Sequence, residues 1–384
     1  MKIKELKARE IKDTRGDKTI EIELITDLGR FIGSAPNGKS RGEYEAEPWK
    51  KSLKSDIANV NSCFIKDINI KRFDDLILIE NTFKKIVGAN TMIALEYTFL
   101  KALAKEEDKE IWQLINNRRG KFPMPIGNAI GGGKHSDKGP VFQEFHFIPE
   151  ATFERAVIIG KRARENCSEI LKNLDKSFKK QTSDENAWKT GLDNENVIAV
   201  IQDVKENMID EFYTRVHCGI DCAASEFFSN EKYNYNKKKL SRKEQIEKII
   251  ELADKFFYIE DPLEQNDFDG FSEIMKKSKG LIVGDDLTAT NYDRILMAIK
   301  KKSVNGVIIK PNQSGSLIEI KKIIELCKKN EIKTIFSHRS GETNENILAD
   351  LAFGFQADYI KTGICGKGRD EKLNRMIEIE RSLF

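Results

Sequence analysis

The stretch GVIIKPNQSGSLIEIKKIIELCKKNEIKTIFSHRSGET, residues 306–343, decides the fold class of this chain. An apolar run at 306–309 ends on Lys310, and a second run at 334–336 leads into the polar segment 337–343. Between the two runs, apolar residues recur at the spacing of a helix with one buried face, at Leu317, Ile320, Ile324 and Cys327. The order strand, helix, strand predicts a parallel βαβ unit that brings cationic side chains to one edge of a sheet.

The same layout, an apolar strand that ends on a charged residue, recurs before and after this stretch. The residues at the predicted strand ends are Asp221, Glu260, Asp285, Lys310, His338 and Lys361. From Glu260 onward they follow one another at intervals of 23 to 28 residues, each long enough for one βα unit. Repeated units of this kind predict a β/α barrel, whose active sites lie at the carboxyl ends of the strands. We therefore expect the three acids, the two lysines and the His-Arg pair to converge on one pocket.

Six short motifs in this part of the chain resemble enolase (phosphopyruvate hydratase). They are GIDCAASEF at 219–227, IEDP at 259–262, GDDLTATN at 284–291, KPNQ at 310–313, SHRSGET at 337–343 and IKTG at 360–363. Each motif is short, but all six follow the family's order and spacing, and the resemblance extends over nearly the whole chain. It implies an α/β protein, with a C-terminal β/α (TIM-like) barrel of the enolase type at 123–384 and an N-terminal α+β capping domain at 1–122.

Length and composition agree with this organisation. A chain of 384 residues is long enough for a barrel and a smaller domain. A net charge of +3 with 33% charged residues describes mixed surface charge and gives no reason to expect a nucleic-acid partner. The beginning of the chain lacks the apolar core of a signal peptide, and no apolar run is long enough to cross a bilayer, so we expect a cytoplasmic protein that does not bind membranes.

The first part of the chain is expected to form the capping domain. Alternating apolar and polar residues predict strands at 3–11 and 19–26, a third strand is expected at 30–34, and a helical pattern runs from about 84 to 104. Glycines, a proline and small polar residues at 35–42 predict a mobile loop.

The resemblance gives this loop a role and also implies a partner. The loop at 35–42 is similar to the enolase lid, whose serine, here Ser40, closes over substrate and binds the second metal ion. The family's N-terminal domain meets a second subunit, which implies a homodimer. Arg15, in the turn at 13–17, is the residue expected to face the partner.

The resemblance implies that the general acid lies in the segment before the motifs quoted above. The sequence TSDENAW at 182–188 resembles the family's Gly-Asp-Glu-Gly-Gly loop with both flanking glycines replaced, which makes Glu185 the candidate. LDNE at 192–195 is a second possible match and would assign Glu195 instead. The 36-residue distance from Glu185 to Asp221 fits the family without a deletion and favours Glu185.

The acids and lysines are the side chains needed to remove a proton from the carbon next to a carboxylate. Asp221, Glu260 and Asp285 offer hard oxygen ligands, which suit Mg²⁺ rather than zinc, and the resemblance implies two Mg²⁺ ions per active site. Two divalent ions and Lys361 can stabilise the dianionic enolate. Neighbouring cations should lower the pKa of Lys310 from the usual value of about 10.4, so that it acts as the base.

The remaining candidates are the general acid with its supporting residue and the residues that contact substrate. Expulsion of hydroxide needs a proton donor on the opposite side, for which we expect Glu185, backed by Glu144. Arg339 offers two parallel donors for a phosphate, and Ser340 adds a hydroxyl. His338 is expected to contact substrate or to orient the acids. The resemblance adds four further substrate contacts, namely His135, Gln143, Glu144 and Lys361, beside the lid residue Ser40.

These residues predict the interconversion of 2-phosphoglycerate and phosphoenolpyruvate with release of water. A second enzymatic possibility is another member of the enolase superfamily that acts on a different carboxylate. The SHRSGET segment and the single lysine at the end of a late strand argue against it, because other subgroups place their bases differently. A third possibility is a binding protein that has lost activity, but such a protein has no need for the complete set of acids, base and phosphate donors.

Overall fold

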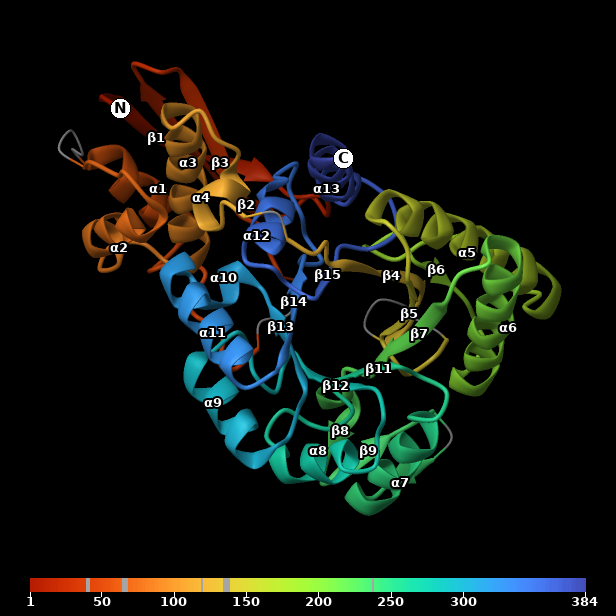
Figure 1. The fold of residues 1–384 in the computed structure, drawn as a ribbon. Coiled ribbons are helices and arrows are strands. Elements are labelled where there is room, and N and C mark those ends of the chain that lie inside the picture. The colour runs from red at the N-terminus through yellow and green to blue at the C-terminus, as the bar shows by residue number, and fades with distance from the viewer. Residues whose placement is uncertain (39–41, 64–67, 119, 134–138, 237) are drawn as a thin grey trace.

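The structure is a computed structural model of the chain (Figure 1). It describes residues 1–38, 42–63, 68–118, 120–133, 139–236 and 238–384. Ser40 and His135 lie outside the described residues, so their predicted roles remain predictions. In the described part of the chain, no helix combines the length and the apolar character needed to cross a membrane.

The chain begins with a three-stranded antiparallel sheet. Its strands are β1 (Ile3–Lys12), β2 (Lys18–Thr26) and β3 (Arg30–Ser34), in the order β1-β2-β3. Alternate residues of a strand face the same side, and in β2 these are the fully buried Ile20, Ile22 and Leu24. The three predicted strands are thereby confirmed within a residue or two.

Among the described residues, five short or medium helices follow the sheet. They are α1 (Leu53–Ser62), the 3₁₀ helix η1 (Phe73–Leu76), α2 (Ile77–Phe83), α3 (Ala89–Glu106) and α4 (Ile111–Ile115). The helix predicted from about residue 84 begins instead at Ala89, because Gly88 has an extended backbone and forms the N-cap. A Cβ atom on Gly88 would lie 2.4 Å from the Cα atom of Trp49, so this close approach requires glycine.

Eight strands close into a barrel, seen nearly end-on in Figure 1. They are β4 (Met124–Gly131), β5 (Glu144–Pro149), β7 (Val216–Asp221), β11 (Tyr258–Glu260), β12 (Leu281–Gly284), β13 (Gly306–Ile309), β14 (Lys333–Ser337) and β15 (Tyr359–Lys361). Pairing of β15 with β4 completes the closure, and the short strand β6 (Trp188–Lys189) pairs with β4 as well. The predicted barrel is thus confirmed.

One strand departs from a wholly parallel barrel. β5 runs antiparallel to both of its neighbours, β4 and β7. The segment 132–143 connects β4 to β5. As a result the first residue of β5, Glu144, lies opposite Asp221, the last residue of β7.

Helices surround the barrel (Figure 1). The main ones are α5 (Phe153–Leu174), α6 (Asn194–Phe212), α7 (Arg242–Leu252), α8 (Phe268–Met275), α9 (Tyr292–Lys301), α11 (Leu317–Lys329), α12 (Ile347–Gly354) and α13 (Asp370–Leu383). Smaller elements are η3 (Ala224–Phe227), α10 (Pro311–Ser314) and a sheet of β8 (Phe228–Ser229), β9 (Lys232–Asn234) and β10 (Lys239–Leu240).

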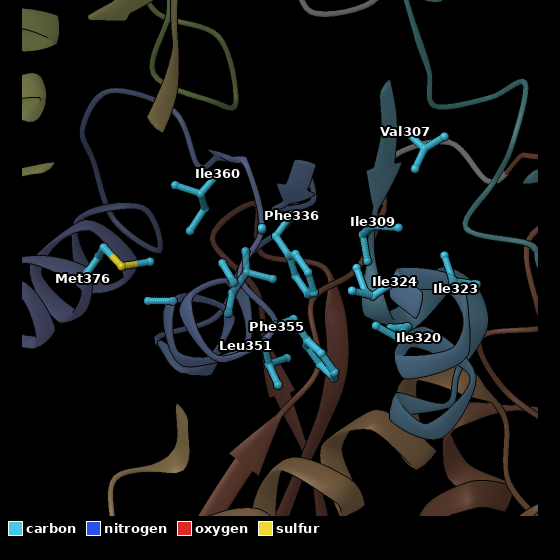
Figure 2. Close-up of a cluster of buried hydrophobic side chains, with 14 of the residues drawn as sticks. Val307, Ile309, Ile320, Ile323, Ile324, Phe336, Leu351, Phe355, Ile360 and Met376 are labelled. Carbon is cyan, nitrogen blue, oxygen red and sulfur yellow. The ribbon is translucent and has the colours of Figure 1, made fainter. Parts of the chain in front are cut away.

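The strand-helix-strand unit predicted from residues 306–343 is present as β13, α11 and β14. All four apolar residues predicted to face inward on α11 are buried. Figure 2 shows Ile320 and Ile324 of α11 beside Ile309 of β13 and Phe336 of β14. This apolar layer fixes the strands against the outer helices and so holds their carboxyl ends in place.

Candidate active site

A polar cleft opens at the carboxyl ends of the barrel strands. Ten predicted residues line it, namely Gln143, Glu144, Glu185, Asp221, Asp285, Lys310, His338, Arg339, Ser340 and Lys361. Glu260 is fully buried and contacts Lys361 at the edge of this group. The described residues predicted for the site therefore lie together, as the barrel layout required.

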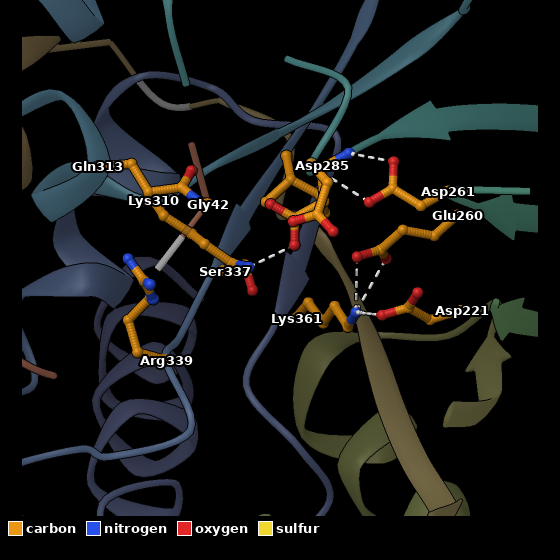
Figure 3. Close-up of polar contacts among 12 residues, drawn as sticks. Gly42, Asp221, Glu260, Asp261, Asp285, Lys310, Gln313, Ser337, Arg339 and Lys361 are labelled. Carbon is orange, nitrogen blue, oxygen red and sulfur yellow. Dashed lines mark hydrogen bonds and ion pairs between the residues drawn. The ribbon is translucent and has the colours of Figure 1, made fainter. Parts of the chain in front are cut away.

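Lys361 lies at the centre of the acids (Figure 3). Its Nζ atom is 2.9 Å from Glu144 Oε2, 3.2 Å from Asp221 Oδ2 and 2.8 Å from Glu260 Oε2. Burial lowers the pKa of Lys361, but the three carboxylates outweigh burial and hold it well above the usual value. Lys361 is therefore a fixed positive charge at the base of the cleft.

Lys310 forms an ion pair with Asp285 on the neighbouring strand end, and Figure 3 shows its Nζ atom directed at that carboxylate. Burial lowers the pKa of Lys310, as do Arg339 and Lys361, but Asp285 and Glu260 oppose them and the net shift is upward. The expectation of a lowered pKa is therefore wrong for the chain by itself. The reason is that the nearest charged group is an acid rather than a second cation.

Asp261 supports the loop that carries Asp285. Its two carboxylate oxygens accept the backbone N–H groups of Asp285, at 3.0 Å, and of Asp286, at 2.7 Å. Asp261 itself has φ of 40°, a left-handed conformation that costs energy for a residue other than glycine. Oxygens of the three aspartates lie within 4.8 Å of one another. Because both oxygens of Asp261 already bind backbone donors, its part in this cluster is to hold Asp285 in place.

The donor set fits a divalent cation. Burial and neighbouring carboxylates raise the pKa of Asp221 to about 7 and that of Glu260 to about 8, despite the opposing effect of Lys361. Asp285 Oδ1 is buried and accepts no hydrogen bond from any described residue. Crowded carboxylate oxygens at one site are the ligands that Mg²⁺ prefers. The carboxylate oxygens found within 4.8 Å of one another are those of Asp261, Asp285 and Asp286, so the predicted ligand set of Asp221, Glu260 and Asp285 stays a prediction.

Arg339 lies in the cleft, on the loop 337–343, and several contacts fix the arginine and its loop. Its Nη1 atom lies 2.9 Å from Glu45 Oε2 and donates to Asn312 Oδ1 at 3.0 Å. Its backbone N–H donates to Glu342, at 2.9 Å. The fully buried Arg369 donates to the backbone carbonyl of Ser340, also at 2.9 Å. Glu45 and Arg369 gave no signal in the sequence, whereas Asn312 belongs to the KPNQ motif.

The same loop is joined to the first part of the chain. Asn37 and Gly341 exchange two backbone hydrogen bonds, at 2.7 and 2.9 Å, and the N–H of Thr14 donates to the carbonyl of Glu342 at 2.7 Å. Arg15, predicted to face a partner subunit, donates to Ser340 Oγ at 3.2 Å. These contacts place residues of the N-terminal segment beside the candidate phosphate donors.

Glu185 lies in the cleft and Glu195 does not. Glu185 is 5% exposed, and its Oε2 atom is 3.5 Å from Nε2 of His338. Burial is the main reason that the pKa of His338 is lowered, although Glu185 opposes this shift. Glu195 is in the first turn of α6, largely exposed, and pairs with Lys248 at 3.1 Å. The structure therefore supports the choice of Glu185 made from spacing.

The loop around Glu185 lacks the flanking glycines of the family's motif, and other residues hold its turn. Ser183 Oγ accepts the backbone N–H groups of Glu185 and Ala187, both at 3.3 Å. Asn186 has φ of 63°, and asparagine enters the left-handed region more readily than most residues. An asparagine and a serine hydroxyl thus make the turn that glycine makes in the family's motif.

A closed barrel with acids and lysines at the carboxyl ends of its strands, beside a smaller α+β segment, is an enolase-type barrel protein. The profile described as "Enolase, N-terminal domain" matches residues 3–115, and "Enolase, C-terminal TIM barrel domain" matches residues 120–384.

Curated relatives named "Enolase" span essentially the full chain. The protein of Picrophilus torridus is 35% identical over 400 residues, which cover 100% of this chain and 99% of that protein. The protein of Sulfurisphaera tokodaii is 37% identical over 407 residues, with 99% and 95% covered. That of Archaeoglobus fulgidus is 34% identical over 395 residues, with 99% and 97% covered. The chain belongs to the enolase family, the phosphopyruvate hydratases, which are lyases.

Proposed function

We propose that the protein catalyses the reversible dehydration of 2-phosphoglycerate to phosphoenolpyruvate, in glycolysis and gluconeogenesis. The observation that carries this proposal is the placement of Lys310 and Glu185 in one cleft, with the fixed charge of Lys361 and a group of carboxylates in the same site. A base, an acid and a site for charge stabilisation are the three parts that this elimination needs. The alternatives are a different carboxylate substrate, or binding without catalysis.

Two Mg²⁺ ions are proposed as cofactors. Asp221, Glu260 and Asp285 would hold one ion, and Ser40 is the candidate ligand that the resemblance adds for the second. Bound Mg²⁺ supplies positive charge that stabilises the enolate as it forms. The buried oxygens of the three acids support this assignment.

Lys310 is proposed to remove the proton from C2. Neutralisation of Asp285 by its bound cation would leave burial, Arg339 and Lys361 as the main influences on Lys310, and all three lower its pKa. The Nζ atom could then accept the C2 proton near neutral pH. Lys361, held by three acids, would keep its proton and face the developing negative charge.

Glu185 is proposed to donate the proton that lets hydroxide leave C3. His338, with its Nε2 atom 3.5 Å away, would orient this acid, and Glu144 would back it. Arg339 and Ser340 are proposed to bind the phosphate, with Gln143, Glu144, Lys361, Ser40 and His135 as further substrate contacts.

A direct assay separates the possibilities. Phosphoenolpyruvate absorbs in the near ultraviolet, so we expect absorbance to rise when the protein is mixed with 2-phosphoglycerate and Mg²⁺, and a chelator to stop the rise. A protein that binds 2-phosphoglycerate without turnover would be the binding protein named above. Failure to bind it, with turnover of another carboxylate, would support the superfamily alternative.

We further propose a cytoplasmic homodimer in which residues 1–122 form the capping domain and 123–384 the barrel. The support is family membership, together with the start of β4 at Met124. Light scattering at micromolar concentration should give the mass of two chains. A mass of one chain, about 43.9 kDa, would contradict the dimer.

A further inference from the structure

Two polar rings lie one layer below the acids of the cleft, inside the barrel. His146 comes two residues after Glu144 on β5, and Tyr258 comes two residues before Glu260 on β11. Residues two apart on a strand face the same side, so both rings lie beneath the carboxylates of their own strands. Both residues are 0% exposed. Sequence reasoning had assigned neither of them a role.

Each ring contacts the acid above it. His146 Nε2 lies 2.7 Å from Glu144 Oε2, the same oxygen that is 2.9 Å from Lys361 Nζ. The hydroxyl of Tyr258 donates to Glu260 Oε2. The two rings meet edge to face, with centroids 5.6 Å apart and an interplanar angle of 85°. They therefore form a continuous polar floor under Glu144, Lys361 and Glu260.

Gly219 provides the space for this floor. It lies on β7, between β5 and β11, and is the register partner of both His146 and Tyr258. A Cβ atom at Gly219 would lie 3.0 Å from Cβ and Cδ1 of Tyr258, closer than ordinary packing permits. Below the rings the barrel interior is apolar, with Ile126, Ile148, Val283, Ile308 and Ile335. The rings thus mark the boundary between the apolar core and the polar cleft.

The contact of His146 with Glu144 has a defined direction. An ionised carboxylate only accepts hydrogen bonds, so Nε2 must carry the proton and donate it. Burial and Glu185 raise the pKa of Glu144, but Lys361 and His146 outweigh them and leave it lower than usual. The Nδ1 atom of His146 has no hydrogen-bond partner among the described residues. The imidazole is therefore specialised for one contact, with Glu144.

We propose that His146 is a positioning residue for the dehydration step: its Nε2–H holds the Glu144 carboxylate between Lys361 and Glu185. This inference rests on the proposed function. Glu144 and Glu185 line the same cleft and interact electrostatically, so the position of the Glu144 carboxylate sets the charge that the proposed acid faces. Without the N–H donor, Glu144 keeps its contact with Lys361 but loses the one that fixes its oxygen from below. Removal of the C2 proton, which depends on Lys310, does not need this contact.

A matched pair of variants tests the proposal. His146→Gln keeps an N–H donor at the end of a chain of similar length, whereas His146→Met has similar bulk and no donor. In the full-length protein with Mg²⁺, dehydration should fall about 10- to 100-fold in His146→Met, the usual effect of losing a supporting hydrogen bond in a site. Exchange of the C2 proton of 2-phosphoglycerate with solvent should stay at the wild-type level. His146→Gln should recover much of the dehydration rate.

His217 supplies the control. Its Nε2 atom also lies 2.7 Å from a glutamate, Glu150 Oε1, but at the amino-terminal end of β7, away from the cleft. His217→Met should change neither rate. Equal losses of exchange and dehydration in His146→Met, or no recovery in His146→Gln, would overturn the proposal. Wild-type protein without dehydration activity would instead refute the proposed function.

A measurement on unsubstituted protein covers the case in which His146→Met does not fold. The chain has only four histidines, so ¹⁵N spectra of the imidazoles are simple to assign. His146 should carry a proton on Nε2. A ring protonated at Nδ1 could not donate to Glu144 and would overturn the proposal.

Discussion

Nη1 of Arg339 lies 2.9 Å from Oε2 of Glu45, and the other oxygen of Glu45 accepts the backbone N–H of Gly42 at 2.9 Å. One buried carboxylate therefore links the end of the predicted lid at 35–42 to the arginine proposed to bind phosphate. Asn312 holds the same guanidinium from another side. The orientation of Arg339 is thus set before any phosphate binds.

Arg339→Lys should raise the KM for 2-phosphoglycerate by roughly tenfold or more, with a smaller change in kcat. Lysine keeps the charge but cannot make two parallel hydrogen bonds, and a hydrogen bond to a charged group is worth about 1.5 to 3 kcal/mol. Steady-state kinetics measure both constants. Arg242→Lys, at an exposed ion pair with Asp267, is the control. An unchanged KM in the Arg339 variant would place the phosphate elsewhere.

Lys310→Ala should abolish exchange of the C2 proton while leaving Mg²⁺ binding nearly intact, because the base is not a metal ligand. Proton NMR in deuterium oxide follows the exchange, and calorimetry measures the affinity for Mg²⁺. Lys301→Ala removes an exposed lysine paired with Asp269 and should leave both unchanged. Exchange at the wild-type rate in Lys310→Ala would rule out Lys310 as the base.

Asp261→Asn should weaken Mg²⁺ binding about 10- to 100-fold, although Asp261 is not proposed as a ligand. Its carboxylate positions the backbone of Asp285 and Asp286, and loss of such support commonly costs that factor. Asp285→Asn, which removes a charged ligand, should weaken binding at least as much. Titration with Mg²⁺ in the absence of substrate measures both variants. Wild-type affinity in Asp261→Asn would show that the loop holds its shape without it.

Glu185→Gln should lower turnover by about 10² to 10⁴-fold, the usual contribution of general acid catalysis, while C2 exchange survives. Lys310 would still face the C2 hydrogen, but no acid would protonate the leaving hydroxide. Glu195→Gln is the matched comparison on the exposed first turn of α6 and should turn over normally. The reverse result would mean that the later match at 192–195 is the correct one.

Asp175→Asn should lower stability in a pH-dependent way. Burial raises the pKa of Asp175, but hydrogen bonds from Ser177, Thr190 and Gly191 outweigh burial and lower the pKa to about 2. A depressed carboxyl pKa stabilises the fold above the unfolded-state value, and the contribution is lost as pH falls through the folded-state value. The lowered pKa of Asp175 corresponds to a contribution of about 2 kcal/mol to the free energy of unfolding.

Urea unfolding measures this difference. Near neutral pH the variant should be less stable than the wild type by about that amount, and the gap should shrink as pH falls from about 4 towards 2. If the difference in unfolding free energy stays constant over this range, the lost stability comes from altered local packing rather than from the lost charge.

The barrel could be predicted because each strand end in its second half combines an apolar run with a charged residue, at regular intervals. The antiparallel β5 could not, since Glu144 begins its strand rather than ending it, and that reversal is set by the pairing of β5 with β4 and β7. The sequence of β5 does not show whether this strand runs parallel or antiparallel to its neighbours.

Some residues of the candidate site could likewise be predicted from the sequence, and others could not. Lys310, Asp285 and Lys361 follow apolar runs and could be found directly. Glu45 acts through a contact with the distant Arg339, so its partner is visible only in the folded chain. His146 contacts Glu144 two residues earlier on β5, but the sequence does not show that this strand directs both side chains into the barrel. In the chain by itself the pKa of Lys310 is raised, and sequence could not show that Asp285 points at it.

The paired backbone hydrogen bonds between Asn37 and Gly341, together with the one from Thr14 to Glu342, form a seam between the start of the chain and the SHRSGET loop. Because every one of these bonds joins backbone groups, substitutions of the side chains at these positions can leave the seam intact, apart from proline at a donor position. A deletion or insertion in either segment would instead shift the donors and acceptors out of register. The seam therefore constrains the length and path of the two segments more than their side chains.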